Sequence, residues 1–232
     1  MRTIGWLSLC CLALSSAGFA GDGAPLVLPA PEIHSGKPLM QALKERRTTR
    51  ELTPGPVSLQ ELGNLLWAAF GINRPDTGGR TAPSAMNSQE IELYVALTNG
   101  VYLYQPREHQ LAPVVQGDLR GSISSQAFVK NAALVLVYVA RLDRLAKARP
   151  ESRPFYAAID AGCIIQNVYL FCASENLGTV VFDLERKTPA TLLGLGADQE
   201  IILAQAVGAL PQPPNSGARS RDPETPAPSP GR

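Results

Sequence analysis

Residues 44–50, with the sequence KERRTTR, form the strongest candidate anion-binding segment of the chain. Three arginines and two threonine hydroxyls fall within one or two turns, where a predicted helix gives way to a loop. The guanidinium fork matches the geometry of phosphate oxygens, and charge-assisted hydrogen bonds are stronger than neutral ones. A phosphate group is therefore the ligand this segment favours, and a solvated basic surface is the alternative that composition alone leaves open.

Residues 81–89, with the sequence TAPSAMNSQ, form a second candidate binding segment. Proline, serine and asparagine precede an apolar stretch that is typical of a strand, and these residue types favour an ordered loop. Such a loop can offer backbone and amide hydrogen bonds to a flat polar ring. An ordered loop without a ligand is the alternative reading.

Several kinds of catalytic site lack their parts in this chain. Only His34 and His109 are present, so neither a histidine-rich metal site nor a Ser-His-Asp triad can be built. GxSxG, GxGxxG and Walker A patterns do not occur in the sequence. Asp160, Asp183 and Glu185 show no catalytic spacing, and we interpret them as surface or helix-end charges. Redox or group-transfer chemistry would therefore depend on a cofactor.

The N-terminus predicts export. Arg2 precedes an apolar run that is too short to span a bilayer and that ends in small residues, so residues 1–20 are expected to be a secretory signal peptide. Cys10 follows Leu9 and not a small residue, which argues against a lipid anchor. The expected location is periplasmic or secreted.

Composition predicts one domain of ordinary size after the signal peptide, with no second apolar run long enough for a membrane span. The 21 basic residues nearly balance the 20 acidic ones, so charge gives no reason to expect nucleic acid or an anionic membrane as partner. Cys163 and Cys172 are the two thiols of the mature chain, and on one helix their Cα atoms would lie roughly 13 Å apart, too far for a disulfide.

Hydrophobic periodicity predicts an α+β domain, with a mostly antiparallel sheet packed by helices. Residues 21–37 form an extended lead-in and residues 211–232 a proline-rich tail, and both ends are expected to be mobile. A capping box of Ser58 and Glu61 opens the second helix, a turn at Asn99-Gly100 joins the first two strands, and Leu177-Gly178 ends the longest helix. Helices are expected at residues 39–47, 58–70, 125–131, 154–176 and 189–193, and strands at residues 91–97, 101–104, 111–115, 133–140 (central), 179–182 and 201–207.

Five segments in this order resemble the nitroreductase family of FMN enzymes, in particular the branch of azoline-oxidising (thiazole- and oxazole-forming) peptide dehydrogenases. The resemblance covers about residues 38–210. The segments are RRTTR at residues 46–50, SLQELGNLLWAAFGI at 58–72, RTAPSAMNSQEIELYV at 80–95, GVYLYQPREHQL at 100–111 and YAAIDAGCIIQNVYLFCASENLGTVV at 156–181.

The resemblance implies a nitroreductase-like fold and an interlocked homodimer with FMN at the interface. One subunit would hold the phosphate and ribityl chain with Arg46 and Arg50, with Arg47 and Thr48 beside them. The partner subunit would bring the second binding segment to the flavin ring. The residues of that segment are Pro83, Ser84, Ala85, Asn87 and Gln89.

The resemblance also places the backbone of Val181, Phe182 and Asp183 at the reactive flavin N5 atom. Two departures from the family pattern stand out: Leu184 takes the place of a common glycine in this loop, and the basic residue that relatives carry near the C-terminus is missing. Arg80 or Arg120 could replace that cation. Gln166 and Asn167 match a recurrent pair in relatives, and we interpret them as buried helix-packing groups.

The resemblance implies hydride transfer between flavin N5 and a small-molecule substrate, with no side chain required as acid or base. Export separates the protein from cytoplasmic NAD(P)H. The leading hypothesis is therefore an exported FMN-dependent oxidoreductase that oxidises its substrate. An NAD(P)H-dependent nitroreductase and a non-catalytic flavin- or metabolite-binding protein are the alternatives.

Overall fold

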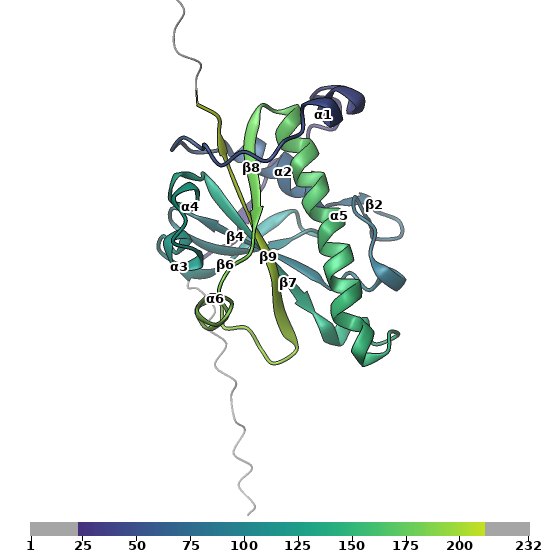
Figure 1. Cartoon of the computed structure of the whole chain (residues 1–232). Coiled ribbons are helices and arrows are strands. Elements are labelled where there is room, and N and C mark those ends of the chain that lie inside the picture. Colours follow the sequence, from purple (N-terminus) through teal and green to yellow (C-terminus); the bar gives the residue numbers. More distant parts are fainter. Residues whose placement is uncertain (1–22, 212–232) are drawn as a thin grey trace, which may run out of the picture.

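A seven-stranded antiparallel sheet forms the centre of the molecule (Figure 1). The computed structural model describes residues 23–211. The strand order is β1-β6-β5-β4-β7-β9-β8, and a separate hairpin is formed by β2 and β3. The strands are β1 (Leu26–Val27), β2 (Ile72–Arg74), β3 (Gly79–Arg80), β4 (Ile91–Leu97), β5 (Gly100–Gln105), β6 (Gln110–Gln116), β7 (Leu134–Arg141), β8 (Leu177–Phe182) and β9 (Gln199–Ala209).

Helices cover both faces of the sheet (Figure 1). The helices α2 (Leu59–Phe70) and α5 (Arg153–Ser174) pack on one face, and α1 (Leu39–Glu45) lies against α5. The other face carries the short helices α3 (Arg120–Ile123), α4 (Ala127–Asn131) and α6 (Lys187–Leu192). The expected α+β architecture is confirmed.

β7 is central because its side chains are apolar on both faces. Leu134, Leu136 and Tyr138 point to the α2/α5 side, whereas Val135 and Val137 point to the other side. A strand buried on both faces has no polar alternation, which is why this run could be assigned from the sequence. Tyr138 is fully buried, and its hydroxyl donates a 2.6 Å hydrogen bond to Gln205 Oε1 on β9.

The start of α2 forms as the sequence predicts. The Ser58 hydroxyl accepts a hydrogen bond from the Glu61 N–H at 3.1 Å, and the Glu61 carboxylate accepts one from the Ser58 N–H at 2.9 Å. This reciprocal pair satisfies two backbone donors that a helix N-terminus otherwise leaves free. The capping box is confirmed.

Two predicted turns lie elsewhere. The β4–β5 turn consists of Thr98 and Asn99, because Gly100 already pairs with Leu97 as the first residue of β5. A Cβ at Gly100 would lie 2.8 Å from the Val115 carbonyl oxygen, so glycine is needed there for strand packing.

Leu177-Gly178 belongs to β8 and does not end α5. The left-handed residue between helix and strand is Asn176, with φ of 59°. Gly178 leaves room for the side chains of Leu52 and Leu210. A Cβ at this position would lie 2.6 Å from the Leu52 side chain and 2.9 Å from that of Leu210.

The lead-in is anchored, so the expectation of mobility was wrong for residues 23–37. β1 pairs with β6, and the Leu28 N–H donates to the His109 carbonyl at 3.1 Å. Further along, the Glu32 N–H donates to Asn64 Oδ1 on α2 at 2.9 Å. The proline-rich composition removed the pattern from which these long-range bonds could be predicted. The predicted signal peptide and residues 212–232 of the tail lie outside the described residues.

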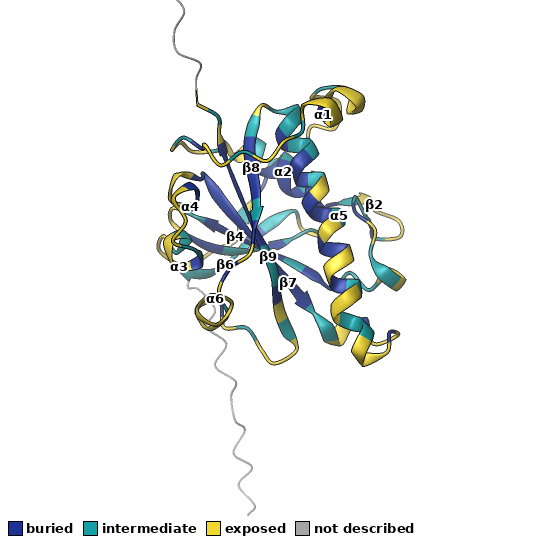
Figure 2. Ribbon diagram, in the orientation of Figure 1, coloured by how far each residue is buried: buried dark blue, intermediate teal, exposed yellow. Residues whose placement is uncertain are grey.

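One side of α5 faces away from the sheet and is exposed (Figure 2), and several residues on this side are apolar. Phe155 is 64% exposed and Ile159 is 47% exposed. Ala158, Gly162 and Gln166 continue the same exposed stripe at helical spacing. A Cβ at Gly162 would meet no atom of this protomer, so nothing within the chain requires glycine there. Residues 155–166 on this side of α5 are called the α5 stripe below.

By length and composition alone, residues Pro150–Ser174 also have the properties of a membrane-spanning helix, whereas the sequence predicts no second apolar run of that length. The buried side of α5 accounts for much of this composition, because Ala161, Ile164 and Val168 pack fully into the core. A long core helix that is also apolar on part of its outer side passes the same test as a membrane span.

Candidate functional site

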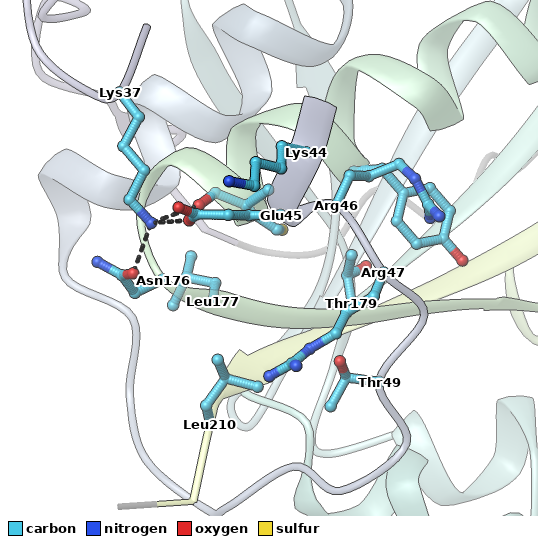
Figure 3. A pocket seen from close by; sticks show the side chains of 13 residues that line it. Lys37, Lys44, Glu45, Arg46, Arg47, Thr49, Asn176, Leu177, Thr179 and Leu210 are labelled. Atoms are coloured by element: carbon cyan, nitrogen blue, oxygen red, sulfur yellow. Dashed lines mark hydrogen bonds and ion pairs between the residues drawn. The ribbon is translucent and has the colours of Figure 1, made fainter. Parts of the chain in front are cut away.

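The KERRTTR segment borders a pocket of about 440 Å³ at the end of α1 (Figure 3). The walls come from the lead-in, the end of α1, the C-terminal half of α5 and the start of β8. The lining residues are Lys37, Lys44, Glu45, Arg46, Arg47, Thr49, Tyr169, Cys172, Ala173, Asn176, Leu177, Thr179 and Leu210. We call this cavity the cation pocket.

The backbone turns at Arg46 and so places the motif in the pocket. Arg46 is the C-cap of α1: its N–H still donates to the Ala42 carbonyl at 2.8 Å, but its ψ of 123° is extended. Three residues later, the Thr49 N–H donates to the Thr179 carbonyl of β8 at 2.9 Å. The segment between these two bonds is therefore fixed at both ends, and Arg46 and Arg47 both line the cavity. Arg47 reaches toward Leu210, whereas Arg46 extends to the other side, over the Tyr169 ring (Figure 3).

The pocket has an excess of positive charge. Lys37 is neutralised, because its ammonium group contacts the Glu45 carboxylate at 2.7 Å and the Asn176 side-chain oxygen at 2.7 Å. The hydrogen bond from Lys37 holds the pKa of Glu45 below its ordinary value. Within residues 23–211, Lys44, Arg46 and Arg47 have no carboxylate partner. Three unpaired cations around one cavity suit a phosphate group.

Tyr169 of α5 connects the motif to β8. Its hydroxyl lies 3.0 Å from the Thr48 hydroxyl and accepts a hydrogen bond from the Val181 N–H at 3.1 Å. The Arg46 guanidinium lies over the Tyr169 ring, 5.3 Å from its centre. A single buried side chain thus positions one residue of the cation pocket and two residues beside it.

Removal of the Tyr169 hydroxyl is expected to loosen this junction. Tyr169→Phe keeps the ring but leaves the Val181 N–H and the Thr48 hydroxyl without their partner, so we expect a loss of roughly 1–3 kcal/mol in the free energy of unfolding. Tyr156→Phe, on the same helix, is the control, because no hydrogen bond of its hydroxyl is found within the described part of the chain. Urea denaturation of both variants measures the difference, and equal small losses would contradict the role given to Tyr169.

The second segment, residues 83–89, folds into a tight loop against α5. Met86, Asn87 and Gln89 all have positive φ, between 49° and 56°. The Ser84 hydroxyl accepts from the Gln89 N–H at 2.8 Å and closes the loop. The Ala85 N–H donates to the Asp160 carboxylate of α5 at 2.6 Å. Pro83 and Asn87 are exposed, so the loop presents polar groups at the surface.

The sequence suggested that Asp160 is a surface or helix-end charge, and the structure contradicts this. Asp160 is only 5% exposed and holds the loop from beneath. Its position on α5, between alanines that pack in the core, explains the burial, and its spacing alone gave no indication of the partner backbone 75 residues away. Asp183 and Glu185 are exposed, as expected.

One protomer does not bring the two binding segments together. The loop contacts α5 at Asp160 and the RRTTR motif contacts it at Tyr169. Nine residues along a helix correspond to roughly 13 Å. The prediction that the two segments act in one site through different subunits stays a prediction, and this separation is compatible with it.

The predicted N5 loop begins at the cation pocket and then leaves it. Val181 is half-buried, with its N–H bonded to Tyr169, but the Phe182 side chain packs in the core against Phe128, with ring centres 5.3 Å apart. Asp183 is exposed and forms an ion pair with Arg186 at 2.8 Å. Arg186 also donates to the carbonyls of Ile201 and Leu184 and so fixes the loop, a role the sequence analysis did not identify.

Neither proposed substitute for the missing C-terminal cation reaches the cation pocket of its own protomer. Arg120 pairs with Asp118 at 2.7 Å. Arg80 lies over the Phe70 ring and donates to Gln89.

Arg50, which was expected to hold the phosphate with Arg46, is exposed and does not line the cation pocket. Lys44 lies there instead.

The Gln166–Asn167 interpretation was half right. Asn167 donates to the Ala69 carbonyl on α2 at 3.3 Å, which is helix packing. Gln166 is exposed on the α5 stripe, because it falls on the outward side of the helix. Cys163 and Cys172 are free thiols on one helix, as predicted. Within residues 23–211, no three His, Cys, Asp or Glu side chains gather in a way that could hold a metal ion.

Comparison with known proteins places the chain in a family. The nitroreductase family model matches residues 43–209. A candidate nitroreductase of Methanocaldococcus jannaschii is 30% identical over 168 residues, which cover 68% of this chain and 84% of the relative. The crystal structure of a candidate nitroreductase from Ralstonia eutropha is 42% identical, with a TM-score of 0.77, and the match covers 81% of this chain and 90% of that one.

Two more distant solved structures share the fold. The NADPH:FMN oxidoreductase of Vibrio harveyi, complexed with NAD+, matches with a TM-score of 0.56 at 19% identity, over 75% of this chain and 69% of that one. The microcin synthetase McbBCD complex of E. coli, with truncated pro-MccB17 bound, matches with a TM-score of 0.60 at 17% identity, over 91% of this chain and 85% of that one. The family match, the two closer relatives and the shared fold agree: the chain belongs to the nitroreductase family.

Proposed function

We propose that this protein is an exported FMN-dependent oxidoreductase that transfers hydride between flavin N5 and a small organic or peptide-derived substrate. The observation that carries the proposal is the cation pocket, with three unpaired cations at the RRTTR motif of a nitroreductase-family chain. When bound, FMN supplies the hydride chemistry, so the protein needs no acid or base of its own.

Lys44, Arg46 and Arg47 would hold the phosphate. Their ammonium and guanidinium groups are not committed to any carboxylate of the described chain, and charge-assisted bonds to a dianion are the strongest available to them. Lys44 would take the place of the C-terminal cation that this sequence lacks. Thr48, positioned by Tyr169, lies beside the pocket for the ribityl chain.

The flavin ring would lie between two copies of the chain. The α5 stripe is apolar and exposed, and its small residues Ala158 and Gly162 would permit close contact with a second helix. Exposed apolar surface of this kind marks interaction sites. In such a homodimer the 83–89 loop of the partner would cover the ring, with Asn87 and Ser84 as polar contacts and Pro83 excluding water.

The substrate and the location are parts of the same proposal. The microcin synthetase complex that shares this fold has truncated pro-MccB17 bound, and by analogy with it we infer a peptide-derived substrate such as a thiazoline. Oxidation would remove a hydride and a proton from the ring to give the aromatic azole, while the flavin gains both. Export through residues 1–20 would make NAD(P)H scarce and favour this direction, and fusion of these residues to a reporter that is active only outside the cytoplasm tests the export.

An anaerobic titration separates the functions. The FMN-loaded protein is mixed with a thiazoline-containing peptide, and loss of the oxidised-flavin absorbance with formation of the thiazole supports the proposal. Reduction by NADPH but not by organic donors would instead favour a nicotinamide-dependent nitroreductase. Retention of oxidised FMN in the presence of every donor would favour a binding protein without turnover.

A further inference from the structure

Glu90 is a fully buried carboxyl group with one unsatisfied oxygen. It directly precedes β4 and is 0% exposed. Its Oε2 atom accepts a hydrogen bond from the Ser84 hydroxyl at 3.0 Å. Its Oε1 atom has no hydrogen-bond partner, and among the described residues it is the only buried side-chain nitrogen or oxygen of which this is true. A buried ionised carboxylate with an unsatisfied oxygen is strongly unfavourable.

The second buried carboxyl, Asp160, binds the neighbouring residue of the same loop. Burial is the main cause that raises the pKa of Glu90, and the Asp160 carboxyl raises it further. The two carboxyls bracket one loop, since Glu90 binds Ser84 and Asp160 binds the Ala85 N–H. Two carboxylates that bind adjacent residues of one loop in a buried site disfavour each other's ionisation when no counter-ion is present.

No cation of residues 23–211 forms an ion pair with either carboxyl. The charged groups of the surrounding elements are directed elsewhere. Arg141, at the end of β7, pairs with Asp143. Arg144 pairs with Glu92 and also donates to the Gln89 carbonyl at 3.2 Å, but it forms no ion pair with Glu90 or Asp160 within the described residues. Arg80 donates to Gln89, and Arg153, at the start of α5, donates to the Ala148 carbonyl. A proton is the remaining way to neutralise the pair.

We propose that Glu90 and Asp160 share one proton, and that this proton holds the 83–89 loop on α5 in the conformation that faces the flavin. Glu90 is then a positioning residue for the site. The protonated pair satisfies Glu90 Oε1 and leaves the bonds to Ser84 and Ala85 intact. Loss of the proton places two like charges beneath the loop and releases it.

The pH range follows from the pKa of Glu90. Burial raises this pKa to about 7, and Asp160 contributes in the same direction, against the hydrogen bonds from the Glu90 backbone and Ser84. The folded state therefore keeps a proton that the unfolded chain, with an ordinary value near 4.5, has lost. The added stability is complete below the unfolded pKa, declines as pH rises between the two values and is absent above about 7.

Glu90→Gln tests the shared proton. The amide keeps the shape, can accept from Ser84 and can donate to Asp160, so it replaces the proton permanently. We expect the unfolding equilibrium constant of the wild type to rise by about two orders of magnitude relative to Glu90→Gln between pH 5 and pH 7.5, because all other titrations cancel in the comparison. Urea denaturation of the flavin-free protein at each pH gives the ratio.

The matched control is Glu92→Gln, two residues along the same segment. Glu92 is paired with Arg144 at 2.7 Å, so its substitution is expected to leave the pH dependence of the wild type in place. Asp160→Asn is the second test variant, because Asn can still accept from Ala85 but cannot share the proton. A ratio that stays constant with pH for both Glu90→Gln and Asp160→Asn would overturn the proposal.

The consequence for the site rests on the proposed function. FMN affinity of the wild type should fall tenfold or more from pH 6 to pH 8, and that of Glu90→Gln should not. If neither protein binds FMN at any pH while the stability ratio changes as expected, the proposed function fails and the shared proton stands. If FMN binds with the same pH dependence in both, the link between loop and flavin is wrong.

Discussion

Replacing Arg46 and Arg47 together by glutamine is expected to weaken FMN binding by about a hundredfold or more, since each charge-assisted bond contributes roughly 1.5–3 kcal/mol. Both guanidinium groups line the cation pocket and have no other anionic partner in residues 23–211. Glutamine keeps a polar side chain with hydrogen-bond donors, but it is shorter than arginine and removes the charge. Flavin fluorescence quenching at fixed ionic strength measures the dissociation constant.

The control for this experiment is an arginine outside the site. Arg149 is exposed, and its one ion pair within residues 23–211 is with Glu151 at 3.6 Å, so Arg149→Gln should leave FMN affinity within about twofold. Lys44→Gln should give an intermediate loss, because it removes one cation of the three. An unchanged FMN affinity of the Arg46/Arg47 double variant would show that the FMN phosphate does not bind in this pocket.

A charge on the α5 stripe is expected to separate the subunits and release the flavin together. Ile159→Glu would bury an unpaired carboxylate in the proposed interface, and we expect the dimer dissociation constant to rise by about a hundredfold or more. FMN retention should fall in parallel, because the ring would lose the 83–89 loop of the partner. Light scattering and flavin content of the same sample measure both effects.

Leu192→Glu provides the matched substitution, because Leu192 is an exposed leucine of α6, on the other face of the sheet. It should change neither subunit mass nor flavin content. A monomeric Ile159→Glu variant with full flavin content would place the whole site within one protomer and contradict the two-subunit arrangement.

Most of the fold could be predicted from local sequence patterns. The continuous apolar run of β7, the capping box of α2 and the helical spacing of α5 each depend on residues close in sequence, and the structure follows them closely. The lead-in escaped prediction because its anchors are bonds to Asn64 and His109, far along the chain. Gly178 misled because a glycine after a helix favours a turn, whereas here it serves strand packing.

The candidate site was predictable in its charged motif and not in its supports. The composition of RRTTR is enough to predict an anion site. Tyr169, in contrast, was indistinguishable from the apolar positions of α5, since its role depends on contacts with Thr48 and Val181. The role of Asp160 could not be predicted for the same reason, because burial of a carboxylate beneath a loop depends on tertiary contacts. Lys44 belongs to the KERRTTR segment. The excess of positive charge in the cation pocket could not be predicted, because it depends on which lysine is neutralised, and the structure shows that Glu45 neutralises Lys37.

The most direct test of the central claim is an absorption spectrum of the mature protein, purified without added cofactor, with the chromophore identified after denaturation. We expect a bound flavin spectrum and release of FMN in equimolar amount to the protomer. A colourless protein that also fails to take up added FMN would contradict the claim that this nitroreductase-family chain is a flavoenzyme.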